Sequence, residues 1–437
     1  MSSRDLHSKH PVAIIGAGLT GLTAAIRLAE QGVDVHIFEA APKAGGRTRS
    51  FYEAKVDCLC DNGPHLLLGA YKATQQLLND CGIAHHITWQ SSLDLPLWDK
   101  QRGLFHFQPS AWLPFHLALL KAVAGLPGHN KSSALSMIKL AATLRSKMSD
   151  TTTVQQWMQD LSMPSELIHD LIEPLCLGAM NEGIDTACAL SFRRVLHESF
   201  TNHQQARLGW FSKPMDEALI EPLCERAKGL GVQLHLRSRI RSIQTSPTGI
   251  RLQDQTFQQV IITLPAYATD QLLGRTTPCE TRAICNIHLW YEQTITLPAL
   301  FVGSLGSTGQ WFFDVSSQMS EQGQQQGKLR HICAVISADK NGLNDQQKGD
   351  DLKLVHIINE ELKAVTANAT LNPVHYRIIK EKRATVLVRS DHTDMDMPKG
   401  CIDASERPQP GQLPATIEWA VQRGEKAAKS CLNRLKS

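Results

Sequence analysis

The first forty residues contain a strand, a glycine-rich turn, a helix and a second strand that ends at an acid. The apolar run Val12–Ile15 leads directly into the turn, which reads GAGLTG. Apolar residues then recur at helical spacing over residues 19–31, and a second apolar run, Val33–Phe38, ends at Glu39. This order is a βαβ unit of the kind that builds doubly wound parallel sheets, so the pattern predicts an α/β, Rossmann-like domain.

Each glycine of the turn has a separate physical role. Gly16 permits the tight turn, Gly18 lets the backbone approach a pyrophosphate, and Gly21 lets the helix pack closely on the strand. The helix begins at Leu19 and Thr20, where free N–H groups and the helix dipole favour phosphate. The turn therefore predicts a phosphate-binding site, although a purely structural glycine turn is the alternative.

Glu39 extends this prediction to a whole dinucleotide. An acid at the end of the second strand accepts hydrogen bonds from a ribose 2′-hydroxyl and disfavours a 2′-phosphate. The strand, the turn, the helix and the acid stand in the order that a dinucleotide-binding unit requires.

A second glycine pair follows the acid almost directly and indicates which dinucleotide is bound. Gly45, Gly46 and Arg47 resemble the extended fingerprint of FAD-dependent amine oxidases and carotenoid desaturases. The glycines would let the backbone pass beside the flavin diphosphate, and Arg47 would make a charge-assisted contact with it. The sequence therefore predicts FAD, with NAD as the alternative, and no cysteine or histidine lies in a recognised flavin-attachment motif, which predicts non-covalent binding.

Composition limits the remaining classes. The 437 residues are too many for one compact core and suit two domains. Lys and Arg total 45 against 42 Asp and Glu, so no basic excess indicates nucleic acid. The eleven cysteines are scattered without a CxxC pair, and Cys58 and Cys60 are too close for a usual zinc motif, so no metal is predicted. With no recognisable signal peptide or membrane-spanning run, we expect a cytoplasmic protein.

The order of helical and strand-like patterns predicts two interleaved domains. Residues 1–90, 212–280 and 383–437 are assigned to the FAD-binding domain, and residues 91–211 and 281–382 to an inserted α+β substrate domain. Within the FAD-binding part, Arg239–Ile243 and Gly249–Leu252 are expected to form a hairpin.

One segment has an unusual charge pattern. No acid occurs between Lys100 and Ser149, whereas seven basic residues are interleaved with apolar ones such as Trp112. A basic amphipathic segment suits an anionic membrane surface, which would place the protein on the inner face of the plasma membrane. The alternative is a helix pair whose apolar face packs on the protein and whose lysines face solvent.

Three further runs resemble the squalene-associated FAD-dependent desaturases, the hydroxysqualene dehydroxylases of bacterial hopanoid pathways. They are DNGPHLLLGAY, which begins at Asp61, EPLCLGAMN, which begins at Glu173, and QWFFD, which ends at Asp314. The resemblance covers most of the chain. It implies a Rossmann-like FAD-binding domain with an inserted substrate domain, as in amine oxidases and phytoene desaturases, and a hydrophobic polyisoprenoid substrate.

The resemblance also carries cofactor contacts to positions of this chain. Besides the glycines, Glu39 and Arg47, it implies that backbone atoms of Ile240 hold the adenine end and that Asp403 belongs to a C-terminal FAD motif. Ile402 stands where that motif has a glycine, and the polar run 393–398 replaces its apolar strand. This departure predicts altered flavin contacts at the C-terminal end.

An allylic hydroxyl leaves as water only after protonation, so the reaction that the resemblance implies needs a weak acid in a dry pocket. The candidates within the discriminating runs are Asp61, His65, Glu173 and Asp314. Each has a structural alternative: a turn, a core histidine, a helix end and a strand cap, respectively. Two other functions stay open, namely a phytoene-desaturase-like oxidation of a polyene and a non-catalytic isoprenoid-binding protein.

Overall fold

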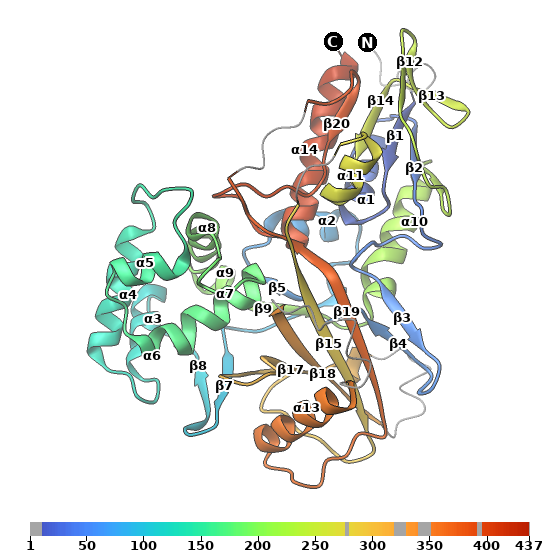
Figure 1. The fold of residues 1–437 in the computed structure, drawn as a ribbon. Helices are drawn as coiled ribbons and strands as arrows, with labels where there is room; N and C mark the ends of the chain where they lie inside the picture. The colour runs from blue at the N-terminus through green and yellow to red at the C-terminus, as the bar shows by residue number, and fades with distance from the viewer. Residues whose placement is uncertain (1–10, 276–278, 319–328, 340–350, 391–395, 437) are drawn as a thin grey trace.

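The computed structural model describes residues 11–275, 279–318, 329–339, 351–390 and 396–436. A parallel sheet with its helices occupies one end of the molecule, a seven-stranded sheet the other, and a group of helices lies to one side, at the left of Figure 1. Among the described residues, no helix is both long enough and apolar enough to cross a bilayer.

The predicted α/β fold is present as a five-stranded parallel sheet in the order β10-β2-β1-β14-β20. Its strands are β1 (Val12–Ile15), β2 (Val35–Phe38), β10 (Gln233–His235), β14 (Gln259–Ile262) and β20 (Cys401–Asp403). Strands β1 and β2 are fully buried, as their unbroken apolar runs require. The strand β20 forms in spite of the polar run before it, of which residues 393–395 lie outside the described part of the chain.

Two helices pack on each other beside this sheet at very close range. Helix α1 (Leu19–Ala29) follows the glycine turn, and α14 (Ile417–Lys436) closes the chain. A Cβ on Gly424 would lie 2.5 Å from the carbonyl oxygen of Thr20, and one on Gly21 would lie 2.0 Å from that of Gly16. Only glycine at these two positions permits such packing.

The predicted hairpin has different bounds. Residues 239–243 form no strand, and the antiparallel unit consists of β11 (Gln244–Ser246), β12 (Gly249–Leu252) and β13 (Gln255–Phe257). The prediction for Arg239–Ile243 was wrong because Ile240 and Ile243 pack on the same core three residues apart, which is not the two-residue alternation of a strand.

The seven-stranded sheet has the order β19-β15-β18-β17-β16-β7-β8. Its strands are β7 (Leu95–Asp99), β8 (Gly103–Phe107), β15 (Thr281–Tyr291), β16 (Phe301–Ser304), β17 (Trp311–Asp314), β18 (Arg330–Asp339) and β19 (His375–Val386). Residues alternate along β17, so Phe312 packs in the cluster with α13 (Asp351–Thr366), while Trp311 and Phe313 join the core on the opposite face.

Smaller elements complete the fold. The remaining strands are β3 (Ser50–Glu53), β4 (Cys58–Asp61), β5 (Leu66–Leu68), β6 (Ile87–Trp89) and β9 (Leu208–Phe211). The remaining helices are α2 (Lys72–Asp80), η1 (Ala84–His86), α3 (Phe115–Ala124), α4 (Lys131–Thr143), α5 (Val154–Asp160), α6 (Ser165–Leu167), η2 (Ile168–Ile172), α7 (Glu173–Met180), α8 (Ala189–Ser199), α9 (His203–Ala206), η3 (Asp216–Ile220), α10 (Glu221–Gly229), α11 (Ala266–Leu272) and η4 (Ser316–Gln318). The segments assigned to the two domains supply the two large sheets, although β9 pairs with β5 and β6 across the proposed boundary, and the division stays a prediction.

Candidate functional site

The glycine turn forms an open cradle at the start of α1. Gly18 is the N-cap residue and offers no side chain to the first-turn N–H groups, which have no partners within a helix. No described protein atom lies within 4 Å of a Cβ built on Gly18. The second glycine pair lies directly beside it, because the Gly45 N–H donates to the Ala17 carbonyl at 2.8 Å. The cradle therefore has both the donors and the space that a diphosphate needs.

Glu39 lies at the other side of the cradle. Its carboxylate accepts hydrogen bonds from the N–H groups of Ala17 and Ala41, each at 2.8 Å. The segment before Ile240 runs beside it, since the Ser238 N–H donates to the Glu39 carbonyl at 2.7 Å. Glu39 and Ile240, which were predicted to contact the ribose and the adenine, thus lie on neighbouring segments of the chain.

Arg47 makes a contact that the sequence did not predict. Its guanidinium pairs with the buried carboxylate of Glu406 and donates to the Ala384 carbonyl at 2.6 Å. Near this pair, Arg423 donates to the Ala404 carbonyl at 2.8 Å, and burial lowers the pKa of Arg423 to about 10. Arg47 is therefore anchored to the C-terminal segment before any ligand contact is considered.

Several buried polar atoms in this segment have no hydrogen-bond partner among the described residues. They are Ser405 Oγ, Glu406 Oε1 and Arg423 Nε. Buried polar groups are almost always paired in folded proteins, so these atoms, with Arg407 Nε, are able to make contacts with a polar ligand. Ile402, in contrast, points into the apolar core with Ile261 and Ile417, while Asp403 caps the N–H of Ser405 at 2.8 Å.

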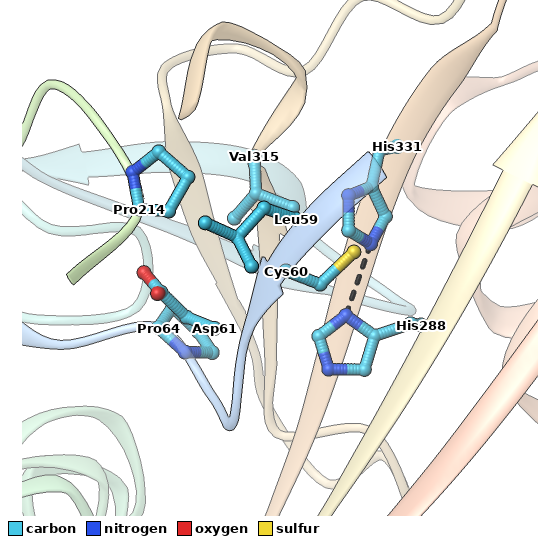
Figure 2. Close-up of a pocket in the computed structure, with 8 residues that line it drawn as sticks. All are labelled: Leu59, Cys60, Asp61, Pro64, Pro214, His288, Val315 and His331. Carbon is cyan, nitrogen blue, oxygen red and sulfur yellow. Dashed lines mark hydrogen bonds between the residues drawn. The ribbon is translucent and has the colours of Figure 1, made fainter. Parts of the chain in front are cut away.

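A second site lies where β4 meets the seven-stranded sheet. Asp61 lines a cavity of about 10 Å³, together with Cys60, Pro64, Pro214, His288 and His331 among others (Figure 2). Its Oδ1 accepts hydrogen bonds from the Ser50 hydroxyl and the Met215 N–H, both at 2.7 Å, and no described donor contacts Oδ2. Burial raises the pKa of Asp61 to about 7, in spite of these two bonds. Asp61 is thus a fixed weak acid beside a water-sized cavity.

Two buried histidines form the opposite wall of this cavity. His288 Nδ1 and His331 Nε2 are 2.9 Å apart, and the Cys60 thiol is turned toward them in Figure 2. Burial lowers the pKa of His288 to about 3, and it also lowers that of His331. Both imidazoles are therefore neutral, and Asp61 is the acidic group of this cavity at neutral pH.

Sequence similarity to a known family agrees with the geometry of the glycine cradle. Residues 19–402 match the profile of the family described as flavin containing amine oxidoreductase. The chain belongs to this family. It is accordingly an FAD-dependent oxidoreductase, as the glycine fingerprints predicted.

Individual relatives show how far the similarity extends along the chain. The chain is 26% identical to the hydroxysqualene dehydroxylase of Zymomonas mobilis over 96% of its own length and 98% of that protein, and 27% identical to that of Rhodopseudomonas palustris over 95% and 97%. Among solved structures it is similar to cyclohexylamine oxidase from Brevibacterium oxydans, with a TM-score of 0.68, 15% identity and coverage of 98% and 100%. These matches confirm the resemblance and the fold that the sequence analysis stated.

The cradle fits the family's cofactor. The N–H groups at Leu19 and Thr20 and the open approach at Gly18 suit the diphosphate, and Glu39 suits the ribose. The unpaired atoms of Ser405 and Arg423 would be available for further polar contacts at the C-terminal side. The assignment of each contact stays a prediction.

The other sequence candidates do not line the cavity beside Asp61. Glu173 lines a separate cavity of about 270 Å³ with His169 and Trp311. Asp170 precedes Glu173 by three residues. Burial alone would raise the pKa of Asp170, but hydrogen bonds from Arg102, His169 and His129 lower this pKa to about 2. Glu173 therefore lies beside a fixed anion rather than beside Asp61.

His65 and Asp314 have structural partners. His65 Nδ1 lies 2.8 Å from the Gly63 carbonyl oxygen, and burial lowers the pKa of His65. Asp314 Oδ1 accepts the Ser316 N–H at 3.0 Å at the end of β17, as a strand cap does. These contacts favour the structural alternatives for both residues.

The sequence analysis missed two groups of polar side chains. His288 and His331 meet only through the antiparallel pairing of β15 with β18, and Arg102 and Asp170 are 68 residues apart. The alternation within each strand could have indicated which face His288 takes, but no local signal connects either pair.

Proposed function

We propose that this protein carries out the reductive dehydroxylation of hydroxysqualene to squalene. The observation that carries the proposal is Asp61, a half-buried carboxylic acid with a raised pKa, one anchored oxygen and a water-sized cavity beside it. Similarity to hydroxysqualene dehydroxylases over nearly the full length supports the choice of substrate.

Asp61 would donate the proton that turns the allylic hydroxyl into water. With a pKa of about 7, roughly half of the Asp61 carboxyls hold a proton at neutral pH. The hydrogen bonds from Ser50 and Met215 fix Oδ1, so that Oδ2 is left to meet the hydroxyl. The C–O bond then breaks, and the cavity has room for the water that leaves.

Reduced FAD, when bound, supplies the hydride that replaces the hydroxyl. The alcohol, one proton and one hydride thus give the hydrocarbon and water. The neutral His288 and His331 add no positive charge to the cavity wall, where a charge would oppose formation of an allylic cation.

The rest of a long apolar substrate would lie along β17. Val315, at the small cavity, and Trp311, at the larger one, are on the same face of the sheet and separated by four residues, or about 13 Å in an extended strand. Phe313 lies between them on that face. These side chains are buried in the core, so a polyisoprenoid chain that joins the two cavities would have to displace them.

A single-turnover experiment tests the reaction. The holoenzyme is reduced with deuteride, mixed anaerobically with hydroxysqualene, and the product is examined by mass spectrometry. We expect squalene with one deuterium on the former carbinol carbon, and only the first turnover is informative because the transferable hydrogen of reduced flavin exchanges with solvent. Squalene formed without consumption of reduced flavin would refute the proposal.

A parallel assay separates the other functions. If oxidised enzyme instead desaturates a polyene while reduced enzyme leaves the alcohol unchanged, the protein is a desaturase. Purified protein that binds the isoprenoid without turnover in either direction is a non-catalytic homologue.

A further inference from the structure

The helical hairpin formed by α3 and α4 exposes large apolar side chains. Trp112, in the turn before α3, is 96% exposed, Leu117 is 57% exposed, and Leu135 is 59% exposed. Five of the eleven exposed large hydrophobic residues in the described chain lie between residues 104 and 138. Apolar side chains gathered in this way on a surface indicate an interaction site.

Helix α4 leaves two large apolar side chains exposed while it buries two serines. Ser133 and Ser136 are buried, whereas Leu135 and Ile138 are exposed. Lys131, Leu135 and Ile138 are spaced four and three residues apart, so they lie on one face of the helix. Helix α4 also packs Leu140 and Met137 on the core, as the alternative of a packed helix pair expects, but Leu135 and Ile138 remain on its outer side.

The same hairpin carries unpaired positive charge. Lys121, Lys131 and Lys139 are exposed, and no described acid pairs with any of them. Arg102 differs, because it holds Asp170 with two hydrogen bonds at 2.5 and 2.7 Å and is not available to a partner. The free charge of the segment is thus carried by the lysines that flank the exposed apolar residues.

Buried polar contacts fix the base of the hairpin. Between α3 and α4, His129 Nε2 lies 2.9 Å from the Asp170 carboxylate, and Arg102 donates to the Pro127 carbonyl at 3.2 Å. The exposed residues therefore belong to a hairpin whose base is fixed. This hairpin lies in the helical group at the left of Figure 1.

We propose that the α3–α4 hairpin docks the protein on an anionic lipid bilayer. Trp112, Leu117, Leu135 and Ile138 enter the interface, and Lys121, Lys131 and Lys139 contact the headgroups. Exposed tryptophan and aliphatic residues beside lysines, in a segment without any acid, are complementary to such a surface. The docking rests on this surface alone and does not depend on the reaction proposed above.

Cosedimentation of the holoenzyme with vesicles tests the electrostatic part. We expect binding to phosphatidylglycerol–phosphatidylcholine vesicles that weakens with added salt, and much weaker binding to pure phosphatidylcholine. Changing Lys121, Lys131 and Lys139 together to Gln should lower the partition coefficient on the order of a hundredfold at low salt. The control variant, with Lys353, Lys426 and Lys429 changed to Gln, removes equal charge from exposed sites elsewhere and should bind like the parent.

Apolar insertion is tested separately. Leu135→Ser should reduce binding, whereas Leu352→Ser, at a 67% exposed position on α13, should not. A blue shift of tryptophan emission on vesicle binding should disappear in Trp112→Phe. Equal binding to both vesicle types, no binding, or equal effects of the hairpin and control variants would overturn the proposal.

A second copy of the chain is the other partner that this surface could accept. Sedimentation velocity distinguishes it. If the parent is a dimer that Leu135→Ser converts to a monomer, and vesicle binding is unchanged, the surface is a protein interface and the lipid proposal is wrong.

Discussion

Replacing Asp61 with Asn should remove the proton donor and keep the fold. An Asn side chain still accepts the hydrogen bonds that Ser50 and Met215 donate to Oδ1. The amide is also uncharged, so it avoids the burial of charge that raises the pKa of the native carboxyl to about 7. We therefore expect a stable protein whose single-turnover rate with hydroxysqualene falls by about 10²–10⁴, the usual contribution of a general acid.

The pH dependence provides the sharper measurement. The protonated fraction of Asp61 is about nine-tenths at pH 6, about one half at pH 7 and about one-tenth at pH 8, so the parent's rate should fall about fivefold from pH 7 to pH 8 and about tenfold per pH unit beyond that. In Ser50→Ala the carboxylate loses a donor that lowers its pKa, so this limb should move to higher pH.

The rate of the parent and of both variants is measured as anaerobic reoxidation of the flavin after the reduced enzyme is mixed with the alcohol. Asp61→Asn at near-parental rate, or an alkaline limb that Ser50→Ala leaves in place, would show that another group supplies the proton. Circular dichroism of both variants checks that the comparison is made on folded protein.

Three other changes test the fold and the cofactor site. Gly18→Val meets no described protein atom, so it should fold normally but lose the flavin absorbance that denaturation releases from the parent; full absorbance in the folded variant contradicts the cradle assignment. Gly424→Ala puts a Cβ 2.5 Å from the Thr20 carbonyl and should cost about 1–3 kcal/mol in denaturant unfolding, whereas Gly229→Ala has open space and should not destabilise. Because the pKa of His288 is about 3 when folded and near 6.5 when unfolded, the unfolded chain binds more protons in this range, and His288 should contribute a fall in stability of about 1.4 kcal/mol per pH unit as the pH drops below 6.5, to which the lowered pKa of His331 adds. His288→Phe should flatten that slope, and an unchanged slope would contradict burial of a neutral imidazole.

The parts of the fold that the sequence predicted are those encoded by neighbouring residues. The turn from Gly16 to Gly21 and the strand ending at Glu39 each follow from a local pattern, and the structure forms both. The failure at Arg239–Ile243 shows the limit, because Ile240 and Ile243 reach the core three residues apart, a spacing that a strand with its two-residue alternation does not give.

The site was only partly predictable for the same reason. Asp61 could be nominated from a short run, but its raised pKa depends on burial by segments far away in the chain. The Arg47–Glu406 pair joins residues 359 positions apart, and the Asp170 cluster joins three separate elements. Such contacts follow from the tertiary arrangement and leave no periodic signal.

The parallel sheet has a consequence for how the protein matures during synthesis. The nucleotide cradle is encoded in the first fifty residues, yet β14 is made only after residue 258, and β20 and α14 follow the seven-stranded sheet. Until about residue 430 has left the ribosome, the sheet around β1 is not completed by the pairing of β14 with β20 and by α14. The face of α1 that later meets Gly424 is uncovered during this time. Contacts of such sequence separation form slowly, so we expect the cofactor to be captured after translation, with the nascent apolar surface needing protection until then.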